Sequence, residues 1–104
     1  MTAARERLPN RRSSELFDFE SMGMRFTASV SRDSTGKILE LFCDNHKAGS
    51  DVGTLVRDSA ILLSFALQHG ADIEAIRRAL CRDSQGRALG PIGEALDQIL
   101  RERS

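Results

Sequence analysis

The sequence predicts an α+β domain, in which a three-stranded antiparallel meander precedes three helices and the first helix is central and buried. Two observations support this class. Apolar residues alternate with polar ones up to about residue 43, as in half-buried strands, and recur at helical spacing after residue 49. The strands come first and the helices follow, an order that favours α+β over alternating α/β units. A chain of 104 residues suffices for one domain with one modest core.

Three short strand patterns occupy the first half of the chain. Phe17 and Phe19 alternate with acidic residues, and residues 24–30 alternate between apolar and polar side chains. Residues 38–43 are predicted as a third strand, and residues 33–36 before it have the composition of a turn. An antiparallel meander with one face on the core is the simplest assembly of these strands.

The first predicted helix begins at Ser50 or Asp51 and runs to His69, where Gly70 closes it. Residues 60–67 are apolar nearly all round, so this helix should be buried on most sides and packed on the sheet. Such a helix carries more apolar surface than one short chain readily buries, and the edge strands of the sheet need cover. We therefore expect a homodimer.

Two shorter helices are predicted to follow. Asp72 caps a helix from Ile73 to Cys81, and residues 82–90 form a loop. Pro91 is expected at the first position of the third helix, because proline loses no hydrogen bond there.

Residues 1–13 lack apolar periodicity and are predicted to form a mobile basic arm before a single domain at residues 14–104. The whole chain balances 15 basic against 15 acidic residues, which disfavours a general nucleic-acid binder. No segment is apolar enough to span a membrane, and the chain shows no secretory signal. We therefore expect a cytoplasmic protein.

Residues 47–51 (KAGSD) have features of an anion site at the start of the first helix. The free N–H groups and positive end of a helix attract phosphate, Gly49 permits close approach, and Lys47 adds charge. The candidate anion- or nucleotide-binding residues are Lys47, Gly49, Ser50 and His69. An ordinary capped helix start remains the alternative, because no Walker motif is present and Asp51 opposes a phosphate.

Metal binding and catalysis are not expected from the sequence. A zinc site would need all the cysteines and histidines to converge, and these are Cys43, His46, His69 and Cys81. No neighbouring residues indicate that either thiol is activated as a nucleophile, and no carboxylate pair suggests acid–base catalysis. We therefore predict no catalytic residue, no metal and no cofactor.

A DNA-binding helix-turn-helix is the alternative function. Ala66, Gly70 and Ile76 have the spacing of that motif, and the helix at residues 73–81 would then enter a major groove. The charged residues that this helix would present are Glu74, Arg77 and Arg78. The balanced net charge counts against this alternative, so nucleic acid is not the expected partner.

An ordered set of segments carries a family resemblance: residues 36–42 (GKILELF), 47–50 (KAGS), 60–64 (AILLS), 66–70 (ALQHG), and the flanking 8–12 (LPNRR) and 90–93 (GPIG). Together they resemble the TSCPD domain family, over roughly residues 8–100. That family includes small stand-alone bacterial proteins and a C-terminal region of vitamin B12-dependent ribonucleotide reductase.

The resemblance implies a non-catalytic accessory or regulatory module. Its expected partner is a nucleotide or a ribonucleotide reductase-related protein in deoxynucleotide supply. The Thr-Ser-Cys-Pro-Asp motif is absent from this sequence, so no cysteine role is carried over. The reductase reaction requires a radical-forming cysteine and a redox cysteine pair inside a large barrel, so the resemblance implies kinship without that reaction.

Overall fold

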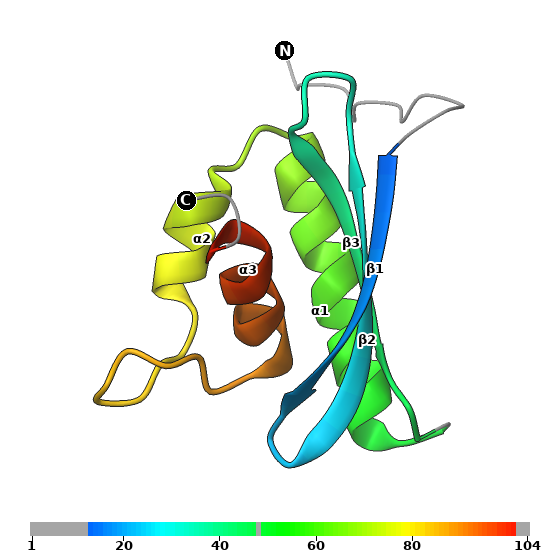
Figure 1. Ribbon diagram of the computed structural model, residues 1–104, viewed down its shortest axis with the longest axis vertical. Helices are drawn as coiled ribbons and strands as arrows, with labels where there is room; N and C mark the ends of the chain where they lie inside the picture. Colours follow the sequence, from blue (N-terminus) through cyan, green and yellow to red (C-terminus); the bar gives the residue numbers. More distant parts are fainter. Residues whose placement is uncertain (1–12, 48, 102–104) are drawn as a thin grey trace.

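The computed structural model describes residues 13–47 and 49–101 and confirms the predicted fold class (Figure 1). Three strands precede three helices: β1 (Ser13–Ser21), β2 (Met24–Arg32), β3 (Ile38–Asn45), α1 (Asp51–Gln68), α2 (Ile73–Ala79) and α3 (Pro91–Arg101). Ser13, which the predicted arm included, is the first residue of β1. The rest of the predicted arm lies outside the described residues.

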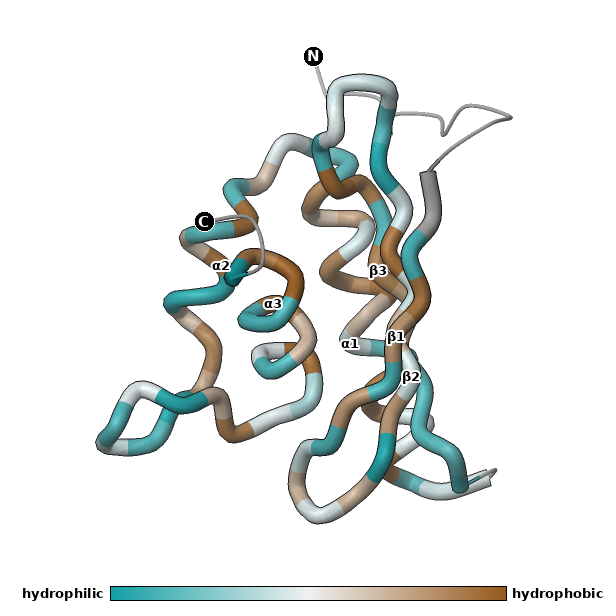
Figure 2. The backbone as a smooth tube through the Cα atoms, in the orientation of Figure 1, coloured by the Kyte–Doolittle hydropathy of each residue, from teal (hydrophilic) through white to brown (hydrophobic). Residues whose placement is uncertain are grey.

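The sheet is an antiparallel meander with β2 in the centre. Phe19 pairs with Phe26 across β1 and β2, and their rings stack with centroids 5.5 Å apart. The core side of β2 is fully buried at Phe26, Ala28 and Val30. All three helices lie on the same side of the sheet (Figure 1), and the apolar segments gather in the strands, α1 and α3 (Figure 2).

Two polar side chains of α1 cover the outer edge of β3. The Leu41 N–H donates to Ser64 Oγ at 2.9 Å, and the same hydroxyl lies 3.0 Å from the Leu41 carbonyl oxygen. Gln68 Nε2 donates to the Leu39 carbonyl at 2.9 Å. These backbone groups face away from β2, so the helix occupies the edge on which another strand would otherwise pair.

α1 packs on the sheet as predicted, while its opposite side remains open. The side chains that it contributes to the core are Val56, Ala60, Leu63 and Leu67. On the other side, Leu55 is 66% exposed and Leu62 is 70% exposed. A sheet can cover only one face of a helix, so the remaining apolar residues of α1 lie at the surface. None of the described helices is long and apolar enough to cross a membrane.

The helix ends differ slightly from the predicted bounds. α2 ends at Ala79 rather than Cys81, because Leu80 has an extended backbone (φ −70°, ψ 155°). α1 ends at Gln68 and His69 is its C-cap. α3 begins at Pro91, as predicted.

Asp97 of α3 joins α2 and the following loop to the rest of the domain. It is 3% exposed, and its carboxylate accepts two hydrogen bonds from Arg82, at 2.8 and 2.9 Å. Arg77 of α2 donates a third at 3.2 Å. These hydrogen bonds, first those of Arg82, lower the pKa of Asp97 although desolvation acts in the opposite direction.

We predict that Asp97→Asn lowers the free energy of unfolding at neutral pH by about 2–4 kcal/mol, because it removes the buried carboxylate with which Arg77, Arg82 and Arg101 pair. The folded-state pKa of Asp97 is lowered, so its stabilisation is present above the ordinary carboxyl pKa. It is lost as the pH falls through the lowered pKa, and the difference between variant and wild type should shrink in acid. Urea unfolding of both proteins, from neutral pH down to acid pH, measures the loss of stability and its dependence on pH.

Asp58→Asn is the matched control, because Asp58 is exposed on α1. It should change the unfolding free energy by no more than about 0.5 kcal/mol. Equal stability of Asp97→Asn and wild type at neutral pH would contradict the role assigned to Asp97.

Candidate functional site

The N-terminal turn of α1 holds three of the predicted binding residues. Ser50 is the N-cap: its Oγ accepts a hydrogen bond from the Gly53 N–H at 3.0 Å and donates one to Asn45 Oδ1 at 3.2 Å. Asn45 Oδ1 also accepts from the Lys47 N–H at 3.0 Å, and Asn45 is only 8% exposed. The buried Asn45 therefore fixes the turn that leads into the helix.

The backbone of this turn is accessible at Gly49. Gly49 has a φ of +74°, and no atom lies within 4 Å of the position that a Cβ would take. Lys47 is exposed beside it, and Asp51 is exposed in the first turn of the helix. The turn thus offers an anion one amine, an open backbone and the positive end of a helix, with one carboxylate opposing it.

His69, the fourth predicted binding residue, lies at the opposite end of α1. The 18 residues of the helix place it roughly 27 Å from the N-terminal turn. Its Nδ1 lies 2.9 Å from the Phe65 carbonyl oxygen, a contact that requires the proton on Nδ1. The structure therefore brings Lys47, Gly49 and Ser50 together and leaves His69 outside their site.

The two cysteines lie in different environments. Cys43 is fully buried in the core, and burial raises the pKa of its thiol to about 12. Cys81 is exposed in the loop after α2. Neither thiol is paired with a histidine, because His46 contacts Thr27 on the outer face of the sheet and His69 contacts its own helix. Over residues 13–47 and 49–101, no group of three or more potential ligands is placed to hold a metal ion.

Sequence reasoning missed a polar cluster on the outer face of the sheet. Thr27 Oγ1 donates to Asp18 Oδ1 at 2.6 Å, and lies 2.7 Å from His46 Nε2. This donation, the largest contribution, lowers the pKa of Asp18. The Thr27 proton is committed to the carboxylate, so His46 Nε2 must donate to Thr27 rather than accept from it. Activation of a threonine nucleophile needs the reverse arrangement.

The helix proposed for DNA binding uses one of its arginines internally. α2 has seven residues, and its Arg77 is bound to Glu74 at 2.9 Å and to Asp97 at 3.2 Å. Arg78 is 65% exposed. Since Arg77 holds α2 to α3, α2 presents one well-exposed arginine to a ligand.

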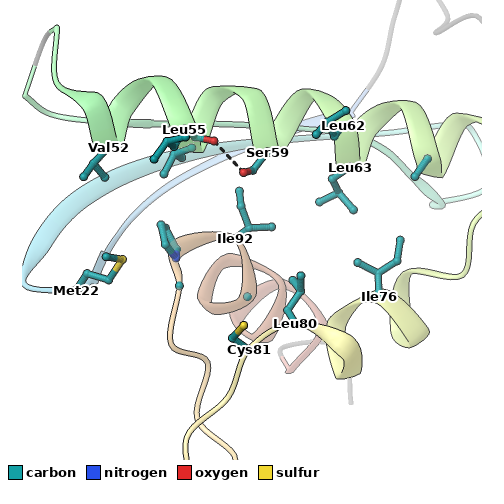
Figure 3. A pocket seen from close by; sticks show the side chains of 15 residues that line it. Met22, Val52, Leu55, Ser59, Leu62, Leu63, Ile76, Leu80, Cys81 and Ile92 are labelled. Atoms are coloured by element: carbon teal, nitrogen blue, oxygen red, sulfur yellow. Dashed lines mark hydrogen bonds between the residues drawn. The ribbon is translucent and has the colours of Figure 1, made fainter.

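An open apolar cavity of about 600 Å³ lies between α1 and the α2–α3 pair (Figure 3). Leu55, Ser59 and Leu62 form its α1 wall, and Leu80 with Ile92 forms the opposite wall. We call this cavity the groove. Ser59 Oγ donates to the Leu55 carbonyl of its own helix at 2.8 Å, so even this hydroxyl presents little polarity to the groove.

The sequence contained a signal for the groove. The excess of apolar residues in the first helix indicated surface that one chain does not bury, but helical spacing alone did not show which side would stay open. That choice depends on how α1 packs against β3.

Comparison with known proteins decides the family of this chain. The family model of the TSCPD domain matches residues 3–103. The chain belongs to the TSCPD domain family. A vitamin B12-dependent ribonucleotide reductase of Agrobacterium fabrum (strain C58 / ATCC 33970) is 33% identical to this TSCPD domain over 70 residues. That match covers 67% of this chain and 6% of the reductase, and no solved structure matches the chain.

We predict that Cys43 does not react with a thiol-specific reagent in the native protein, since it is buried and its thiol remains protonated at neutral pH. The variant Cys81→Ser leaves Cys43 as the one thiol of the chain. Absorbance of the product released by the thiol reagent should show no reaction of this variant until denaturant is added. A native Cys81→Ser variant that reacts as fast as the unfolded chain would show that the core opens readily around Cys43.

Proposed function

We propose that this TSCPD domain is a non-catalytic accessory or regulatory binding module in deoxynucleotide supply, and that it acts in the cytoplasm. The observation that carries the proposal is the size of the shared segment. The 70 residues that resemble the B12-dependent reductase are 6% of that enzyme. Such a segment is too small for a barrel with radical chemistry, which supports an accessory role for the part held in common.

The ligand that we propose for the N-terminal turn of α1 is the phosphate group of a nucleotide. Lys47 supplies charge, Gly49 leaves the backbone accessible, and Ser50 holds the turn through Asn45. A helix start of this kind favours anions. Asp51 limits the affinity, because its carboxylate lies in the same turn.

The test is a thermal-shift panel of ribo- and deoxynucleoside di- and triphosphates on the full chain. A nucleotide at about 100 times its Kd adds roughly 2.7 kcal/mol, which raises the Tm of a domain this size by about 10 °C or more. Lys47→Glu should abolish the shift, and Asp51→Asn should enlarge it by removing the opposing charge. Arg78→Glu, the same charge reversal at an exposed position of α2, should leave the shift unchanged.

A second experiment tests whether the partner is a protein related to ribonucleotide reductase. The full chain is titrated against a purified B12-dependent ribonucleotide reductase, with and without the nucleotides of the panel. Binding of the reductase without any nucleotide shift would support the accessory role and overturn the nucleotide site. Absence of both would overturn the proposed function.

A further inference from the structure

The groove is lined on α1 by a stripe of alternating large and small residues. Leu55, Ser59, Leu62 and Ala66 follow one another at spacings of four, three and four residues, which places them along one side of the helix. Leu55 and Leu62 project from this side and are 66% and 70% exposed. The stripe therefore combines two exposed, projecting leucines with two small side chains, Ser59 and Ala66, beside the cavity.

We propose that the groove is an interface between two copies of this chain, with their α1 helices packed antiparallel across a two-fold axis. This goes beyond the proposed function. When the axis passes between Ser59 and Leu62, Leu62 of each copy lies opposite Ser59 of the other. In the same register, Leu55 lies opposite Ala66. Each large side chain thus meets a small one, as knobs meet holes in paired helices.

The shape of the groove fits this occupant. A two-fold interface uses the same surface on both copies, so that surface must contain both the projecting and the receiving parts. Here the projecting leucines of α1 stand directly beside the cavity that ends at Leu80 and Ile92 (Figure 3). The α1 helix of a second copy can enter the groove with Leu62, while its own groove receives α1 of the first.

The dipoles of the two α1 helices complement one another in the antiparallel arrangement. Asp51 and His69 are five helical turns apart and lie on the same side of the helix as Leu62. Antiparallel packing brings Asp51 of each copy beside the His69 end of the other. It also places the positive end of each helix dipole next to the negative end of its neighbour.

Molar mass from light scattering on the full chain tests the interface. We expect a dimer of two 11.5 kDa chains at micromolar concentration. Leu62→Glu should weaken the dimer at least ~100-fold, because it buries an unpaired carboxylate in each copy. Ile61→Glu is the matched control: Ile61 is 49% exposed on α1 but does not line the groove, so its dimer should persist.

A size swap tests the antiparallel register. Ser59→Leu sets leucine against leucine and Leu62→Ser sets serine against serine, so each single variant should weaken the dimer. The double variant Ser59→Leu/Leu62→Ser again opposes large with small and should recover dimerisation. Circular dichroism and Tm of each variant identify any loss of folding.

A wild-type chain that is monomeric, or a dimer unaffected by Leu62→Glu, would overturn the interface. A double variant no better than the single ones would overturn the register. The nucleotide panel on the same samples separates this inference from the proposed function. A dimer without a nucleotide shift contradicts only the nucleotide site, and a monomer with a shift contradicts only the interface.

Discussion

The hydrogen bonds between Ser64 of α1 and the backbone of Leu41 in β3 determine how α1 sits on the sheet and, through it, where the groove lies. They fix both the height of the helix along the strand and its rotation, since one residue of α1 corresponds to roughly 100° of turn. With Ser64 on the strand edge, Ala60 and Leu67 face the core. The side that carries Leu55 and Leu62 must then face outward, and the groove follows from that.

The same edge connects the sheet to the start of α1. Asn45 ends β3 and holds both the Lys47 backbone and the Ser50 hydroxyl, while Asp44 beside it pairs with Arg57 at 2.7 Å. These contacts join the end of β3, the loop that follows it and the first turns of α1. The N-terminal turn of α1 therefore presents a fixed backbone, which lowers the entropy cost of holding a ligand there.

Local signals predicted most of the fold. Period-two alternation located the strands, Asp72 was predicted and found as an N-cap, and Pro91 marked the start of α3. Features that depend on distant residues were not predictable in this way. The ion pairs of Arg82 depend on Asp97, which lies 15 residues further along the chain. The separation of His69 from Lys47 follows from the length of α1, which the sequence did predict.

The weak packing of α2 has a consequence for how the domain opens. None of the seven residues of α2 is fully buried: the helix is held by the partly buried Ile73 and Ile76, which pack against the core, and by the ion pair of Arg77 with Asp97. Its amides therefore belong to a unit that detaches at a much lower free energy than the sheet or α1, and native-state hydrogen exchange would detect it as the first to lose protection. Because ion pairs with partly exposed arginines are screened by salt, a higher ionic strength should make this unit detach more often.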